Sequence, residues 1–477
     1  MVEKRWVEDA ARTAYRLAKM IVQEGRVDPE RHFMCGDLGR FRGDVGESCQ
    51  WAVEKLSDLV RLRDSPEYND KLQIRTLLRK TARLNERLGA IQRIVADVAG
   101  MSFLDIPSPL VLWLQDVGHK LVGDIGLLVS STGETNFQFE WTPLMEGEPG
   151  EKVPQVGQYC VMRFPASQAN DPFMSVILFH ELGHCYFLVR DVFQAAVQGV
   201  PKSRRDEWQR EVVALADRLR SKYNLPHGPG SQDPILARLG EIVYHWTAEL
   251  FCDSFALRVA GPAYLYASYM FHAGRDISLQ ADWSPDHPPF AVRLQYLWDS
   301  AEKLSWLDAL RRVPAVAQWM EASRSEELRF PQPVQDEAVV ELTSEAFRYV
   351  KELWHHVLPQ VLSLPESLCP GPDGLDHVSK AARAALKDYQ LPYAHPAQDF
   401  RPCADNPMLI VNAALEYVLT DMSSAWGRRF RKDKPSLDDE AEFQQKACEL
   451  TLKALEDALI VQEWQRPHNG SSDKART

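Results

Sequence analysis

Apolar residues recur at helical spacing over most of this chain and alternate with polar residues over one short part of it. The helical pattern covers residues 1–100 and returns beyond about residue 300. Between these parts, alternating or β-rich segments predict strands at Leu127–Ser130, Phe137–Trp141 and Gln158–Phe164. We therefore expect an α+β fold that is mainly helical and contains a small β-sheet.

The changes of pattern also predict how the chain is divided. We expect a helical N-terminal region (1–110), a mixed core (111–300), a helical C-terminal region (301–465) and a disordered tail (466–477). Proline-rich breaks separate the helices of the C-terminal region, which are expected at Asp336–Leu358, Leu375–Tyr389, Pro407–Met422 and Ser436–Trp464.

Two segments of the N-terminal region carry a more particular pattern. Cys35–Ser48 contains four glycines, so we expect a loop there, before a helix that begins at Glu47. Lys71–Ala99 has a seven-residue apolar repeat, broken in one row by Thr81. Such a repeat predicts a partner helix, either in this chain, in another protein or in a second copy of this chain by self-association.

The stretch Asp171–Arg190, DPFMSVILFHELGHCYFLVR, has the pattern of a buried helix and contains an H-E-x-x-H motif. His180 and His184 are four residues apart and therefore lie on one face. Their imidazoles can bind one metal ion at about 2 Å, the usual zinc–nitrogen distance. Glu181 is placed to take a proton from a metal-bound water. The alternative is a core helix in which these side chains only hydrogen-bond to one another.

The residues just before this helix complete the local prediction. Asp171 is expected to be the N-cap of the helix, with Pro172 at its first position. The strand Gln158–Phe164 ends a few residues earlier. As the edge of a sheet, this strand could pair with an extended peptide substrate.

A catalytic zinc site needs a third protein ligand, and a second apolar helix at Pro234–Ala260 offers one. Glu249 is the expected third ligand, and His245, one turn earlier, competes with it. Asp253, one turn later, could accept a hydrogen bond from the other ring nitrogen of a ligand histidine.

Two pairs of residues near the motif bear on which class of metal site is present and which residues bind the metal. Phe187 and Arg190 stand where the metzincin pattern has its glycine and third histidine, so that arrangement is excluded. Cys185 and Cys252 lie beside the expected ligands. We expect both cysteines to pack as small apolar side chains rather than to bind metal.

Three motifs in order resemble the gluzincin metallopeptidases. They are H-E-L-G-H at 180–184, E-L-F-C-D at 249–253, and D-H-P-P at 286–289 with an arginine six residues after its histidine. The pattern is most similar to the family of the membrane-bound proteases of prenylated proteins and the heat-shock membrane protease. The resemblance covers residues 155–300 and implies a zincin-like metallopeptidase core within 111–300.

This resemblance implies roles for individual residues. His180, His184 and Glu249 would bind one zinc ion, and Glu181 would be the general base and later the acid toward the leaving amine.

The third motif would complete the site. By the same resemblance, His287 would hydrogen-bond the oxyanion of the tetrahedral intermediate. Arg293 would hold Glu249 or the loop of His287 in place. A simple turn before a helix, which Pro288 and Pro289 would suit, is the alternative interpretation of this motif.

Charge and composition restrict the partners. The chain has 67 acidic and 55 basic residues, a net charge of −12, which argues against a nucleic acid or an anionic membrane. We find no secretory signal and no uninterrupted apolar stretch that could span a membrane, so we expect no membrane association. Eight scattered cysteines without a C-x-x-C motif are typical of reduced thiols in the cytoplasm.

The sequence therefore predicts a cytoplasmic zinc metalloendopeptidase that hydrolyses a restricted set of proteins or peptides, with the helical regions limiting access to its cleft. A zinc-containing binding or sensor protein with little turnover is the alternative. The presence of a base, a third ligand and an oxyanion donor favours the enzyme. Hydrolysis of another kind of bond would use the same metal and base.

Overall fold

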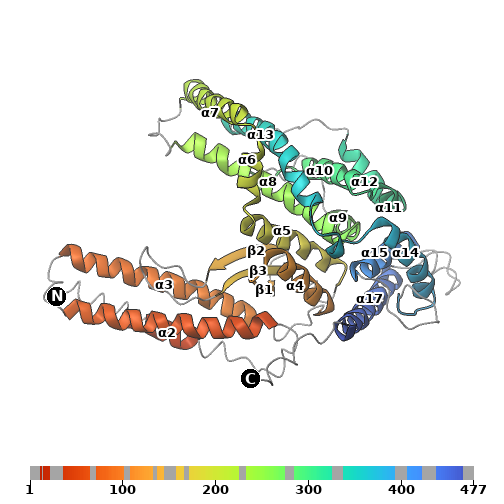
Figure 1. Ribbon diagram of the computed structural model, residues 1–477, viewed down its shortest axis with the longest axis horizontal. Helices are drawn as coiled ribbons and strands as arrows, with labels where there is room; N and C mark the ends of the chain where they lie inside the picture. Colours follow the sequence, from red (N-terminus) through yellow and green to blue (C-terminus); the bar gives the residue numbers. More distant parts are fainter. Residues whose placement is uncertain are drawn as a thin grey trace, which may run out of the picture. The chain divides into compact units, whose positions relative to one another are not determined.

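The computed structural model describes residues 11–12, 14–21, 36–64, 71–100, 108–132, 137–143, 157–165, 171–224, 233–273, 284–324, 337–392, 406–421 and 437–465. They form two compact units, one ending at Asn170 and one beginning at Asp171. Helices dominate both, and the first contains a three-stranded mixed sheet, so the mainly helical α+β class is confirmed (Figure 1). The expected regions 1–110, 111–300 and 301–465 stay predictions, and the expected disordered tail lies outside the described residues.

The first unit combines long helices with the sheet. Its elements are α2 (Gly36–Asp64), α3 (Lys71–Gly100), α4 (Ser108–Val122), β1 (Gly126–Thr132), β2 (Gln138–Pro143) and β3 (Gln158–Pro165). Helices α2 and α3 lie side by side (Figure 1), and the apolar rows of α3 are buried in the core that they share. The partner helix that the seven-residue repeat predicts is thus found in the same chain.

Helix α2 corrects the prediction of a loop at Cys35–Ser48. The helix begins at Gly36 and runs through all four glycines. Phe41, Val45 and Cys49 follow at helical spacing and are buried in the core of this unit. Their burial outweighs the helix-forming penalty of glycine, which is about 1 kcal/mol per residue relative to alanine.

The sheet corrects the prediction of a free edge at Gln158–Phe164. Strand β3 lies in the middle, parallel to β1 and antiparallel to β2. Its residue Val161 pairs with Leu128 on one side and Glu140 on the other. Successive residues of β3 are buried on both faces of the sheet, as in a central strand. No edge of β3 is left for an extended peptide.

The second unit is helical throughout its described part. Its elements are η5 (Met174–Ile177), α5 (Leu178–Val189), α6 (Val192–Gly199), α7 (Lys202–Tyr223), α8 (Pro234–Ala260), α9 (Ala263–Ala273), α10 (Phe290–Lys303), α11 (Leu307–Arg311), α12 (Pro314–Arg324), α13 (Glu337–Leu362), η7 (Glu366–Leu368), α14 (Pro372–Lys387), α15 (Met408–Thr420) and α17 (Leu437–Gln465). None of the helices in the described ranges is long and apolar enough to cross a membrane.

Helix α8 is the centre of this unit. It has the predicted bounds, is apolar over most of its circumference, and packs against α5, α10 and α13. A helix that is apolar all round is stable only when other elements cover it. The four helices expected after residue 330 are also present, as α13, α14, α15 and α17.

Asp171 caps the turn before η5, but the prediction of Asp171 as N-cap with Pro172 at the first helical position is wrong, because η5 has its N-cap at Phe173 and α5 at Ile177. The carboxylate of Asp171 accepts hydrogen bonds from the backbone nitrogens of Phe173, at 2.8 Å, and Met174, at 3.1 Å. The first turn after this cap is the 3-10 helix η5, and the α-helix begins at Leu178.

Helices α5 and α8 approach each other most closely at Gly183. A β-carbon at this position would lie 2.9 Å from the α-carbon of Cys252, which is closer than two carbons pack. Only glycine therefore fits here without moving one helix. The contact also sets the distance between the H-E-x-x-H motif on α5 and the acidic residues of α8.

We predict that Gly183→Ala lowers the free energy of unfolding by about 1–3 kcal/mol, the usual cost of overpacking a core. Gly240→Ala, on the same helix pair, is the matched control. A β-carbon at Gly240 meets nothing within 4 Å, so this variant is expected to be slightly more stable than wild type. Urea unfolding of the metal-free proteins measures both, and a Gly183→Ala protein as stable as Gly240→Ala would contradict the close approach.

Candidate metal centre

Two imidazoles from α5 face one carboxylate from α8. The Nε2 atom of His180 lies 3.4 Å from one oxygen of Glu249, and the Nε2 atom of His184 lies 3.3 Å from the other. All three side chains are largely buried. Residues from two helices thus face one another, and the two histidines approach different oxygens of Glu249.

The spacing of these atoms is compatible with a zinc ion as well as with long hydrogen bonds. Atoms bound to zinc at about 2.0–2.1 Å in tetrahedral geometry lie about 3.3–3.4 Å from one another. An N–H···O hydrogen bond is usually about 2.9–3.0 Å long. The distances from the two histidines to Glu249 have the first value.

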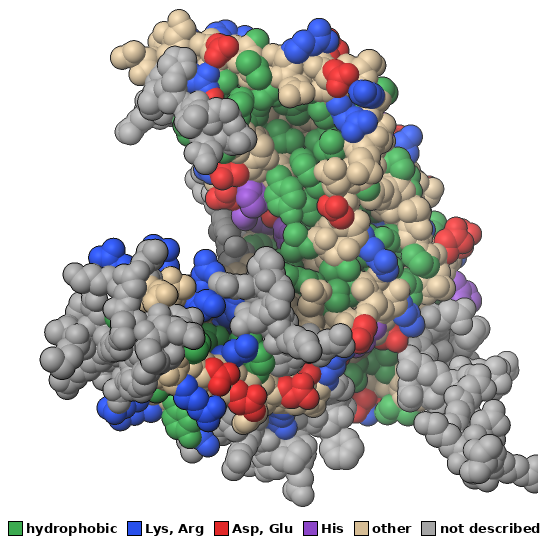
Figure 2. Space-filling model, turned by 60° about the vertical axis from the view of Figure 1, so that its left-hand side comes forward, with side chains coloured by type: hydrophobic (Ala, Val, Ile, Leu, Met, Phe, Trp, Pro, Cys, Tyr) green, Lys and Arg blue, Asp and Glu red, His purple; other side chains and the backbone are tan. Residues whose placement is uncertain are grey.

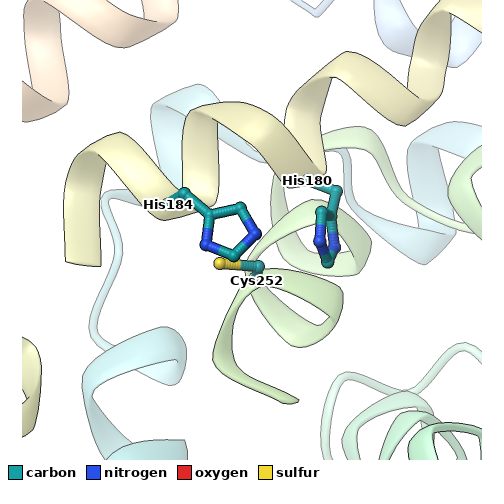
Figure 3. A group of neighbouring side chains, drawn as sticks. All are labelled: His180, His184 and Cys252. Carbon is teal, nitrogen blue, oxygen red and sulfur yellow. The ribbon is translucent and has the colours of Figure 1, made fainter. Parts of the chain in front are cut away.

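Cys252, His180 and His184 form the group of possible metal ligands among the described residues, and Glu249 is not part of that group. The sulfur of Cys252 and one nitrogen from each of His180 and His184 all lie within 4.8 Å of one another. Figure 3 shows both imidazoles pointing from α5 toward this cysteine on α8. The thiol is free and fully buried, and burial together with the charge of Glu249 raises its pKa. It was expected only to pack as an apolar residue, and its position makes it the competitor of Glu249.

The other ring nitrogen of His180 contacts Asp253. Its Nδ1 atom lies 2.9 Å from a carboxylate oxygen of Asp253, one turn after Glu249 on α8. A proton on Nδ1 would be donated to Asp253, which leaves the lone pair of Nε2 toward Glu249. This is the contact expected from the E-x-x-x-D spacing.

Arg293, in the first turn of α10, contacts the two buried acidic residues of α8, Glu249 and Asp253. Its guanidinium donates to the two oxygens of Asp253 at 2.8 and 2.6 Å and lies 3.2 Å from Glu249. The resemblance to gluzincins implied that Arg293 holds Glu249 or the loop of His287. In the structure, Arg293 contacts Glu249. Burial of these carboxylates costs several kcal/mol each unless a charge compensates it.

The charges of this cluster favour a further cation. Burial alone would lower the pKa of His180, but Glu249 and Asp253 more than offset it and raise the pKa to about 10. The pKa of Glu249 is held well below its usual value, against the effect of burial, by Arg293 and His180. A metal ion would take the place of the proton on His180, because histidine binds metal in its neutral form. The donor set and its charge therefore fit a divalent cation such as zinc.

Glu181 lies in the first turn of α5 and is 6 % exposed. Burial raises its pKa, and the charges of His180 and His184 act in the opposite direction. A carboxylate with a raised pKa next to a metal site is suited to accept and return a proton.

The loop with His287 is held by α8. Trp246 donates from its indole nitrogen to the carbonyl of Ser284, at 3.2 Å, and the hydroxyl of Ser284 accepts from the backbone nitrogen of His287, at 2.9 Å. The side chain of His287 is exposed. Desolvation and the charges of Arg293 and His180 lower its pKa, although Glu249 acts to raise it. The loop also leads into α10, so it is a turn before a helix as well.

His245, the competing third ligand on α8, is not among the residues that face His180 and His184. His245 has an exposed side chain, and its ring lies 5.4 Å from that of Tyr244. The side chain of His184, in contrast, is only 20 % exposed. Histidine side chains are visible at the surface of the second unit next to hydrophobic and acidic residues (Figure 2).

Tyr264 is the residue of this cluster that sequence analysis missed. Its hydroxyl donates to Asp253 at 2.5 Å and lies 3.3 Å from the Nδ1 atom of His180. Its ring is stacked parallel to that of His180. Tyr264 follows Asp253 by 11 residues but lies on α9, beyond a reversal of the chain, so the contact is made between two helices.

Comparison with known proteins gives no match: no protein-family model, no curated protein and no solved structure is similar to this chain. The likeness to gluzincins therefore rests on the three motifs.

We predict that Arg293→Met lowers the free energy of unfolding of the metal-free protein by about 3–5 kcal/mol, because it leaves two buried carboxylates without their counter-charge. Arg311→Met is the control, since Arg311 forms an exposed pair with Asp308 three residues away and should matter little. Denaturant titrations of both variants measure the difference. Equal stability of the two would contradict the role of Arg293 as the buried counter-charge.

The third ligand can be identified by exchanging the two competitors. We predict that Glu249→Ala abolishes stoichiometric zinc binding, whereas Cys252→Ala retains it, because Glu249 has the spacing of a ligand to both histidines. Metal analysis after dialysis against a weak chelator gives the zinc content. The reverse result would make Cys252 the third ligand and remove Glu249 from the metal.

Proposed function

We propose that this protein is a zinc-dependent metallopeptidase with a zincin-like core, which hydrolyses peptide bonds in a restricted set of proteins or peptides. The observation that carries the proposal is the convergence of His180 and His184 on Glu249 at the spacing of zinc ligands. Glu181 next to the histidines supplies the base. The order of the three motifs supports a gluzincin type.

Each residue of the cluster would have a distinct part in the reaction. Zinc held by His180, His184 and Glu249 would acidify a bound water and polarise a carbonyl group. Glu181 would take a proton from the attacking water as the carbon–oxygen bond forms. It would then pass this proton to the nitrogen of the amide bond that breaks, so that the leaving group departs as an amine.

His287 would stabilise the negative charge that forms during the reaction, and Arg293 would keep the acidic residues of the site in position. His287 reaches solvent on a loop tied to α8, and in the proposal it donates a hydrogen bond to the carbonyl oxygen as negative charge develops there. Arg293 holds Glu249 and Asp253 in place. Peptide as the substrate follows from the likeness to gluzincins, since the paired strand β3 adds no support to it.

We predict that Glu181→Gln retains one zinc ion and slows cleavage by about 10²–10⁴-fold, the usual contribution of a general base. Glu241→Gln, an exposed glutamate of α8 paired with Arg238, is the matched control and should cleave at the wild-type rate. The measurement is the appearance of new N-termini in cell extract treated with each protein, with zinc content determined in parallel.

The same experiment separates the proposal from its rival. Discrete cleavages by wild type and by Glu241→Gln alone would establish a selective peptidase. Zinc in all three proteins without any cleavage would replace the proposal by the zinc-containing binding protein. Cleavage by Glu181→Gln at the wild-type rate would show that another group is the base.

A further inference from the structure

The corner between α8 and α9 is closed by a residue from a distant part of the chain. Helix α8 ends at Ala260, and Gly261, with φ of 70°, reverses the chain before α9 begins at Ala263. Asn412, on α15, donates from its amide nitrogen to the carbonyl of Ala260 at 2.7 Å. Its amide oxygen accepts from the backbone nitrogen of Ala263 at 2.6 Å.

These bonds fix the direction of the Asn412 amide. The last carbonyl groups of one helix and the first N–H groups of the next lack partners within their own helices. Asn412 is fully buried and supplies one partner of each kind, and it also donates to the carbonyl of Met408 at 2.7 Å. An aspartate would set an oxygen against the Ala260 carbonyl, so neither aspartate nor an apolar residue can replace both bonds.

The corner determines where Tyr264 lies. Tyr264 directly follows the residue whose backbone nitrogen Asn412 holds, and its own nitrogen donates to the carbonyl of Gly261 at 3.1 Å. Its side chain is buried. The position of the hydroxyl at Asp253 is therefore set by the start of α9.

Tyr264 in turn affects which atom the Nδ1 nitrogen of His180 can hydrogen-bond to. Because the hydroxyl of Tyr264 donates to Asp253, it does not donate to the Nδ1 atom of His180. Asp253 also accepts from Arg293 and is held as a pure acceptor. The Nδ1 atom of His180 then donates its proton to Asp253, at 2.9 Å, and Nε2 is the nitrogen that faces Glu249 and is turned toward a metal ion.

We infer that Asn412 and Tyr264 are positioning residues of the metal centre: Asn412 fixes the α8–α9 corner, and Tyr264 transmits this to the Asp253–His180 pair. The C-terminal helix α15 would thus be part of the metal-binding apparatus. This inference rests on the metal centre of the proposed function but does not depend on peptide hydrolysis.

The test is a double-mutant cycle on zinc affinity. Tyr264→Phe removes only the hydroxyl, and we expect zinc affinity, measured by competition with a chromophoric chelator, to fall about 10- to 100-fold, as for other residues that orient a ligand. Asn412→Asp should weaken zinc in the same range. Both substitutions act through the hydrogen bond between Tyr264 and Asp253. The double variant should therefore have a zinc affinity only slightly below that of the weaker-binding single variant.

A control distinguishes positioning from general stability. Ser379→Ala removes a buried hydroxyl that donates to Glu416, also on α15, without touching the corner. It should lower stability and leave zinc affinity unchanged. The absorption spectrum of the cobalt-substituted proteins gives a second readout: it should change in Tyr264→Phe and stay as in wild type in Ser379→Ala.

Each outcome decides the inference. Zinc affinity of Tyr264→Phe within twofold of wild type would overturn it, and this variant keeps the test available if Asn412→Asp does not fold. Fully multiplicative losses in the double variant would overturn the link between the two residues. Absence of zinc binding by wild type would remove the metal centre and the inference with it, whereas zinc binding without cleavage would remove only the peptidase.

Discussion

The second unit is organised around two carboxylates buried in an apolar helix. Glu249 and Asp253 could not stay ionised inside α8 without compensating charge, because an unpaired buried charge costs several kcal/mol. Arg293 from α10 and the two histidines from α5 supply that compensation at distances of 2.6–3.4 Å. One electrostatic requirement therefore links three helices, and it brings the imidazoles and Glu249 together.

Close packing makes this arrangement possible. The absence of a side chain at Gly183 lets α5 approach α8, and the amide of Asn412 turns the chain from α8 into α9, so that Tyr264 reaches Asp253. Helix α15, from the C-terminal region, also contributes: its Asn412 bonds the backbone at the end of α8, the helix that carries Glu249 and Asp253.

Local spacing explains which parts of the site could be predicted from the sequence. His180 and His184 share a helix face, as do Glu249 and Asp253, and a period of 3.6 residues is enough to pair them. The bounds of α8 follow from its apolar pattern and from Asp233, which caps it. The side-chain bonds of Asp171 to residues two and three positions later are also local, although they cap a turn and the helix begins further along the chain.

Contacts between segments distant in the sequence decided the rest. The four glycines of Cys35–Ser48 predicted a loop, but burial of Phe41 and Val45 stabilises helix α2 there. Strand β3 was predicted to be an edge strand, but it pairs with a strand on each side. Neither the contact of Tyr264 with Asp253 nor that of Asn412 with the α8–α9 corner follows any local period. The sequence by itself determined most of the helices and the chemical groups of the candidate metal centre, because these depend on neighbours within one or two turns. Only the tertiary structure decided which residues orient those groups, since that depends on how separate helices pack.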